Sequence, residues 1–188
     1  MKQIHRQVPG KLILIMLLLF SFSTDMLAQQ KIEFYQLTVY HYKTAAQENQ
    51  LDAYLQHALL PALHRLNVKQ VGVFKAIAND TAALKKVYVL IPGKNLNVLT
   101  ELPSKLNADK NFKAAGADYI NAVHTAPPYQ RMETIFMQAF SLAPVMQLPQ
   151  LNAAKNERVY ELRSYESATE KIFQNKVHMF NEGDEIGL

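Results

Sequence analysis

Residues 32–66 read IEFYQLTVYHYKTAAQENQLDAYLQHALLPALHRL, and this stretch decides the fold. Residues 32–42 are rich in aromatic and β-branched side chains, which favours a β-strand. A capping box follows, in which the Thr44 hydroxyl accepts from the third N–H of a helix and Gln47 reaches back. Apolar residues then recur at the helical period to the end of the stretch, and Pro61 predicts a kink or a break. The stretch therefore predicts a strand followed by an amphipathic helix.

The next 75 residues or so predict the rest of one folded unit. The pair Asn79-Asp80 indicates a turn, so the two strands around it are expected to form an antiparallel hairpin. The predicted order is β-α-β-β-α-β, the ferredoxin-like unit of an α+β protein, as a first domain over residues 31–140. The further predicted elements are strands at 71–77, 86–91 and 132–140 and a broken helix at 95–119.

Alternate residues of each predicted strand divide into two faces. We expect the two helices to cover an aliphatic face. The other face carries aromatic side chains among polar ones, so we expect a second sheet over it, from a second unit or a second chain. The aliphatic face is expected to hold Tyr35, Leu37, Val39, Val71, Val73, Ile77, Val87, Val89, Ile91, Ile135, Met137 and Ala139, and the other Gln36, Thr38, Tyr40, Tyr42, Phe74, Tyr88, Leu90, Thr134, Phe136, Gln138 and Phe140.

The pattern begins again after a proline-containing linker at 141–156. The segment YQLTVY at 35–40 is echoed by YELRSY at 160–165, and a second capping box, Ser167 to Glu170, follows. Residues 157–188 are therefore predicted to begin a second domain, of which they hold only the first strand and helix. We favour a fragment of a longer protein, and the alternative is that this half unit completes a neighbouring chain.

The N-terminus resembles a secretory signal peptide over residues 1–28. Basic residues precede an apolar run at 12–22, and cleavage is expected between Ala28 and Gln29. The run is about half the length of a membrane-spanning helix, and its basic flank disfavours a buried core helix. The sequence therefore predicts an exported protein, periplasmic or secreted, with no stable membrane anchor after the signal is removed.

Composition excludes several classes of function. Of 188 residues, 49% are hydrophobic and 19% are charged, as in an ordinary globular protein. The formal charge is +4, and without residues 1–28 there remain 17 basic and 15 acidic residues, too scattered to indicate a nucleic-acid partner. The absence of cysteine excludes disulfides, thiol nucleophiles and cysteine-ligated metals.

No motif in the sequence calls for a cofactor or a metal. There is no phosphate-binding glycine loop, dinucleotide fingerprint or metalloprotease motif. His57 and His64 share a helix face about 10.5 Å apart, too far for one metal ion. We expect neither a metal nor a cofactor.

Candidate ligand-binding residues are few and weakly indicated. His41 ends the first strand and His124 precedes the loop at 127–131, so the two histidines are expected to meet at one end of the sheet. There Arg131 can bind a carboxylate or phosphate, or be a surface arginine beside a proline-stiffened loop. The full set of candidates is Gln36, Tyr40, His41, Arg131, Glu161, Arg163 and Tyr165.

The last three candidates share one face of the predicted second strand. An acid, a base and a phenol two residues apart can line a ligand cavity. The alternative is a satisfied ion pair between Glu161 and Arg163, and the sequence favours that alternative.

Two segments carry a resemblance to a known family. VYELRSY at 159–165 and KVHMFNEGDEI at 176–186 resemble the NIPSNAP family of the dimeric α/β-barrel superfamily, with support from 54–66 followed by VGVF at 71–74, and from AGADY at 115–119. The resemblance spans about residues 31–188 and is closest to exported two-domain bacterial members. It implies paired ferredoxin-like units, a barrel closed by two sheets and a mostly unassigned biochemical role.

Two functions are therefore expected. The first is an exported NIPSNAP-type protein that binds a small ligand or a protein partner between paired sheets, as a homodimer or pseudo-dimer. The alternative is a cofactor-free or haem-dependent oxygenase or an isomerase that uses Tyr40, Tyr165, Glu161 or His41 in an aromatic-lined cavity. Some barrel relatives are such oxygenases, but no residue set here matches a known catalytic signature.

Overall fold

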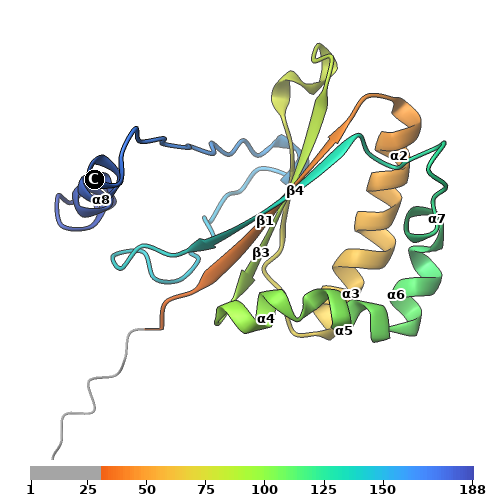
Figure 1. Ribbon diagram of the computed structural model, residues 1–188, viewed down its shortest axis with the longest axis horizontal. Coiled ribbons are helices and arrows are strands. Elements are labelled where there is room, and N and C mark those ends of the chain that lie inside the picture. The colour runs from red at the N-terminus through yellow and green to blue at the C-terminus, as the bar shows by residue number, and fades with distance from the viewer. Residues whose placement is uncertain (1–30) are drawn as a thin grey trace, which may run out of the picture. The chain divides into compact units, whose positions relative to one another are not determined.

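The computed structural model describes residues 31–188, and its centre is a four-stranded antiparallel sheet (Figure 1). The strand order is β2-β3-β1-β4, so β1 pairs with β3 on one edge and with β4 on the other. The element order confirms the predicted ferredoxin-like α+β fold. The strands are β1 (Phe34–Tyr42), β2 (Gly72–Lys75), β3 (Lys85–Gly93) and β4 (Arg131–Gln138).

The predicted signal peptide, with its cleavage site between Ala28 and Gln29, lies outside the described residues. Among residues 31–188, no helix has the length and apolar character needed to span a membrane. The export prediction therefore rests on the sequence.

The helices that connect the strands lie on one side of the sheet (Figure 1). Between β1 and β2 the chain forms one continuous helix. Between β3 and β4 it forms a broken helix, as the sequence predicts, and this second helix consists of four short pieces. The first is α2 (Ala45–Ala53), the π-helical turn η1 (Tyr54–Leu59) and α3 (Leu60–Arg65); the second is α4 (Leu96–Thr100), α5 (Leu102–Ala108), α6 (Lys110–Ala115) and α7 (Ala117–Ile120).

The capping box at the start of α2 forms as predicted. Gln47 N–H donates to the Thr44 hydroxyl at 3.2 Å, and the Gln47 side chain accepts from Lys43 N–H at 2.9 Å. The Gln47 amide also donates to the Pro127 carbonyl at 2.9 Å. One buried glutamine therefore starts the helix and fixes the loop that leads into β4.

The helix break predicted at Pro61 is a change of helix type. Proline has no N–H to donate, and its ring would clash with the carbonyl four residues earlier in an α-helix. The π-helical turn η1 lies directly before it, and Leu60 N–H donates to the Leu55 carbonyl, five residues back. The wider turn accommodates the proline while the apolar face stays on the sheet.

Asn67 ends α3 in the left-handed region, with φ of 63°. Val68 N–H donates to the Leu63 carbonyl at 2.9 Å, and Asn67 N–H donates to the His64 carbonyl at 3.0 Å. These are the two hydrogen bonds of a Schellman motif, and Val68 is buried beside them.

The core lies between the sheet and the connecting helices. Each buried leucine or valine contributes roughly 1.5–3 kcal/mol relative to an exposed one. The buried side chains of the core are Tyr40, Tyr42, Leu51, Tyr54, Leu55, Ala58, Leu59, Ala62, Leu63, Val68, Val87, Val89, Ile91, Leu99, Leu102 and Phe112.

The prediction of which side of β1 and β4 meets the helices is wrong. Thr38 lies opposite Val89 and Tyr40 opposite Val87, so these residues of β1 share the helix-covered face. The face prediction is correct for β3, but β1 and β4 present the alternate residues. The reason is register, because a shift of one residue between paired strands exchanges all their faces.

We call the side of the sheet away from the connecting helices the open face. Leu37, Val39 and His41 are buried on it, but several of its other side chains are half-buried or exposed. It is formed by Tyr35, Leu37, Val39 and His41 of β1, Phe74 of β2, Lys86, Tyr88 and Leu90 of β3, and Arg131, Glu133, Ile135 and Met137 of β4.

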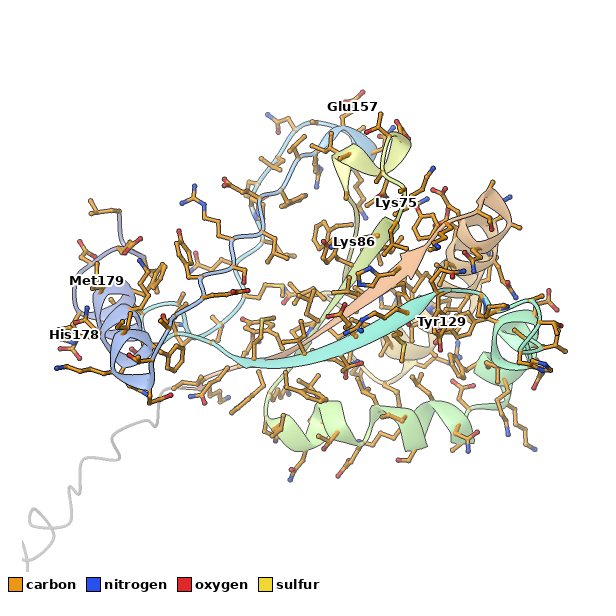
Figure 2. All side chains as sticks on the ribbon, turned by 45° about the horizontal axis from the view of Figure 1, so that its top comes forward. Lys75, Lys86, Tyr129, Glu157, His178 and Met179 are labelled. Carbon is orange, nitrogen blue, oxygen red and sulfur yellow. The ribbon has the colours of Figure 1, made fainter. Side chains whose placement is uncertain are left out.

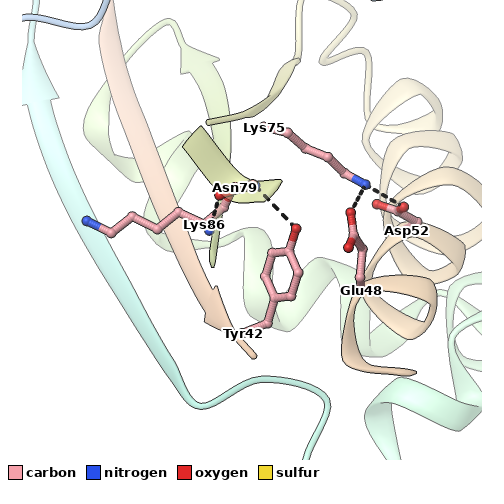
Figure 3. Close-up of polar contacts among 6 residues, drawn as sticks. All are labelled: Tyr42, Glu48, Asp52, Lys75, Asn79 and Lys86. Carbon is pink, nitrogen blue, oxygen red and sulfur yellow. Dashed lines mark hydrogen bonds and ion pairs between the residues drawn. The ribbon is translucent and has the colours of Figure 1, made fainter. Parts of the chain in front are cut away.

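The hairpin of β2 and β3 is closed by a buried asparagine (Figure 3). Asn79, in the short 3₁₀ turn η2 (Ile77–Asp80), donates to the Lys86 carbonyl and accepts from Lys86 N–H, both at 2.9 Å. It also donates to the Tyr42 hydroxyl at 3.3 Å, while Lys75 pairs with carboxylates of α2. These contacts hold the edge strand β2 to the core.

The predicted second unit forms its helix but not its strand. Helix α8 (Glu170–Asn181) begins at Thr169, whose hydroxyl accepts from Ile172 N–H at 3.3 Å, so its cap lies two residues after the predicted Ser167. Residues 158–167 contain no strand, because a strand needs a hydrogen-bonded neighbour and this segment has none among the described residues. The predicted boundaries at 141–156 and 157–188 stay predictions.

Asn67→Ala is expected to lower the free energy of unfolding by about 1 kcal/mol, because a side chain with a Cβ and no local hydrogen bonding is strained in the left-handed region. Asn67→Gly is the matched control and should be at least as stable as wild type. Urea denaturation of the three proteins measures both differences. Equal stability of the alanine and glycine variants would contradict this account of the helix end.

Candidate functional site

His41 and Arg131 meet at one end of the open face, as the sequence predicts. They lie directly opposite each other in the pairing of β1 with β4. Glu133, two residues along β4, joins them: its Oε1 lies 2.7 Å from His41 Nε2 and accepts from Arg131 Nε at 3.1 Å. We call these three residues the His41 cluster.

Burial differs sharply within the His41 cluster. His41 is 7% exposed, whereas the side chain of Arg131 is 69% exposed. The hydrogen bond from His41, followed by that from Arg131, lowers the pKa of Glu133. Glu133 is therefore an ionised acceptor held between a buried ring and an exposed cation.

One polar atom of the cluster has no partner. His41 Nδ1 is buried and makes no hydrogen bond within residues 31–188. If Nε2–H donates to Glu133, the neutral ring leaves Nδ1 as an acceptor, and the protonated ring offers it as a donor. A buried polar atom without a partner costs about 1–3 kcal/mol, so the ring favours a ligand group that supplies one.

Sequence reasoning missed two residues of this region. Glu133 lies two residues after Arg131 along β4, and residues at this spacing in a strand point to the same face. Lys86 belongs to no motif of the sequence, yet it lies directly opposite His41 on β3. Only the strand register reveals that neighbour.

Tyr40 lies on the other side of the sheet, in a cluster of tyrosines. The rings of Tyr54 and Tyr119 stack at 3.7 Å between centroids, and Tyr129 lies 5.8 Å from Tyr40. Burial is the main cause that raises the pKa of Tyr40, Tyr54 and Tyr119. These phenols therefore stay protonated near neutral pH.

An open hollow of about 440 Å³ adjoins the tyrosine cluster. It lies at the loop before β4, and His124 is one of the residues that line it. Within residues 31–188, His124 makes no hydrogen bond to the His41 cluster. The hollow is lined by Tyr119, Ile120, Ala122, Val123, His124, Pro127, Pro128 and Tyr129.

Gln36 is separate from both clusters. It lies opposite Ile91 on the helix-covered side and donates to the Thr38 hydroxyl at 3.2 Å. Its amide thus has a local partner within its own strand.

Glu161, Arg163 and Tyr165 lie on the irregular segment before α8. Arg163 Nε donates to Glu161 Oε1 at 3.0 Å, and both side chains are exposed, so the ion pair favoured by the sequence is present. Tyr165 instead packs on α8, 5.3 Å from the Phe180 ring and beneath the Lys176 ammonium. The structure therefore gives these three residues no shared cavity among the described residues.

Within residues 31–188, no group of three or more histidine, cysteine, aspartate or glutamate side chains is arranged to hold a metal ion. The pairs that the structure does form are hydrogen-bonded ion pairs at the surface or at the His41 cluster.

The chain is similar to solved structures of NIPSNAP proteins. One is a NIPSNAP family protein of unknown function from Agrobacterium tumefaciens str. C58, with 15% identity, a TM-score of 0.47, and coverage of 62% of this chain and 96% of that one. Another is an uncharacterised NIPSNAP-like domain protein from Burkholderia xenovorans, with 12% identity, a TM-score of 0.47, and coverage of 65% and 97%. No family model and no curated protein matches the chain.

Glu133→Gln is expected to lower the free energy of unfolding at neutral pH, because an amide loses the charge in both of its hydrogen bonds. The folded pKa of Glu133 is lowered, so its contribution is complete above the ordinary carboxyl pKa and is lost as pH falls through the lower folded value. The stability difference from wild type should therefore shrink between about pH 7 and about pH 3. Urea denaturation at several pH values measures it, and a constant difference would contradict the ion pairing.

Proposed function

We propose that this chain is an exported NIPSNAP-type binding protein whose open face pairs with a second sheet and binds a small ligand between the two. The observation that carries the proposal is the composition of the open face. It presents apolar side chains from all the inner strands and from edge strand β4, and no connecting helix covers it.

The exposed part of this face is apolar enough to favour a partner. Ile135 is 42% exposed in the middle of β4, and Tyr88 and Leu90 are half-buried on β3, on the other side of the central strand β1. Contiguous apolar surface on a folded domain favours association. A second sheet is the natural cover, because sheets pack face to face at a spacing of about 10 Å with interdigitated side chains.

A second copy of this chain is the partner that the proposal names. The chain carries the pattern of β1 twice, at 35–40 and at 160–165, but the second occurrence is unpaired within residues 31–188. The segment after β4 contacts the sheet at several points, among them Met146 N–H to the Glu33 carboxylate at 2.7 Å and Tyr160 against Phe74, at the β2 edge of the open face. These contacts leave Ile135 free for a partner sheet.

The homodimer is tested with two neighbouring residues of β4 that face opposite sides of the sheet. Ile135→Glu puts a charge on the open face and is expected to convert a dimer to a monomer in sedimentation equilibrium. Phe136→Glu is the matched control, since Phe136 is 47% exposed but lies opposite Gln36 on the other side. A monomeric wild type, or equal effects of both variants, would contradict pairing through the open face.

Export is tested by the N-terminus of the mature protein. When the full chain is expressed in a bacterium, the exported form is expected to begin at Gln29. Leu18→Arg interrupts the apolar run and should leave the precursor uncleaved in the cytoplasm. Mass spectrometry of fractionated cells distinguishes the two forms, and an intact N-terminus on the wild-type protein would overturn the export proposal.

A further inference from the structure

Three basic side chains form one row across the open face. His41 is the register partner of Lys86 on β3 and of Arg131 on β4, so the three side chains point to the same side. Directly opposite residues have Cβ atoms about 4.5–5.5 Å apart. Lys86 extends away from Tyr42, Glu48 and Asp52 on the helix side, as Figure 3 shows. Figure 2 labels Lys86 among the side chains around the sheet.

The charge of this row is positive after its internal pairing. Glu133 is the acid beside the row, and it accepts from both His41 and Arg131. Within residues 31–188, the Lys86 ammonium makes no ion pair. Two cations against one carboxylate leave a net positive charge even with His41 neutral.

The polarity of the open face changes along the strands. The row next to the cations holds Tyr88, Val39 and Glu133, with Phe74 at its edge. The following row holds Leu90, Leu37 and Ile135. This second row lies about 13 Å from the His41 row, at 3.3 Å per residue. The face therefore has a cationic end and an apolar middle.

His41 also leaves its Nδ1 without a hydrogen-bond partner in the described part of the chain, and the protonated ring donates from this atom to a ligand oxygen. This Nδ1 is a buried polar atom in the cationic row. A ligand oxygen at this row would accept from the cations and could pair with the protonated ring.

We infer that the open face binds an amphiphilic carboxylate, with its carboxylate at Lys86, His41 and Arg131 and its hydrocarbon chain over Leu90 and Ile135. This inference rests on the proposed function and names the class of small ligand that lies between the sheets. Charge complementarity determines where the ligand's carboxylate binds, and the apolar rows determine the direction of its hydrocarbon chain. A fatty acid of medium length has this chemistry.

The test uses dodecanoate below its aggregation concentration, with binding measured by isothermal titration calorimetry. Arg131→Gln and Lys86→Gln should each weaken binding about ten-fold, since a charge-assisted hydrogen bond is lost. Lys85→Gln is the matched control and should bind as wild type, because Lys85 is the adjacent residue of β3 but lies opposite Tyr42 on the helix side. Far-UV circular dichroism checks that each variant is folded.

Three further probes distinguish recognition of the ligand's carboxylate from recognition of its hydrocarbon chain and from binding to a lipid surface. Dodecanol lacks the charge and butyrate lacks the chain, so both should bind more weakly than dodecanoate. Vesicles of phosphatidylglycerol should not sediment the protein. No binding of dodecanoate, equal binding of dodecanol, or vesicle binding without dodecanoate binding would each overturn the inference.

The same variants distinguish this inference from the proposed function. If the wild type is a dimer that Ile135→Glu dissociates but dodecanoate does not bind, the ligand class is wrong and sheet pairing stands. If dodecanoate binds a monomeric protein and Lys86→Gln weakens it, the ligand site stands and the pairing of sheets fails.

Discussion

The hydrogen-bonded position of β1 between β3 and β4 is the constraint on which the rest of the structure depends. Because β1 is paired along both edges, its register fixes at once which residues of three strands share a face. Tyr42 opposite Lys85 places Tyr40 and Tyr42 under the connecting helices, where they join the core. The same register places Leu37, Val39 and His41 on the open face. A slip of one residue would exchange both sets, moving the buried tyrosines out of the core and removing the His41 cluster.

Hydrogen bonds from three polar side chains support this register. Gln47 starts α2 and binds the loop before β4, while Asn79 pairs with the backbone of β3 at the tip of the hairpin. Asp109 caps α6 and receives the Arg65 guanidinium at 2.6 Å, so the end of the first helical stretch is joined to the middle of the second. Each of these three side chains satisfies backbone groups that would otherwise be unpaired, and each also joins segments distant in sequence. The sheet is therefore fixed against its helices.

The contrast between β1 and the segment at 160–165 shows what tertiary structure adds to a sequence pattern. Both segments have the same alternation of aromatic and polar residues, and each is followed by a capped helix. The first is a central strand, whereas the second has no ladder within residues 31–188. A strand is stabilised by its neighbours and not by its own composition, so the same pattern gives two structures.

The sequence by itself determined the order of elements, the caps at Thr44 and the helix change at Pro61, because these depend on residues within one or two turns of each other. It also placed His41 and Arg131 at the same end of the sheet. Tertiary structure alone decided the faces of β1 and β4, and with them the joining of His41 to Glu133 and Lys86. The physical reason is that a period of two separates a strand into two faces without saying which one the helices cover. That choice belongs to the register between strands, which depends on contacts of β1 with residues 43 or more positions away.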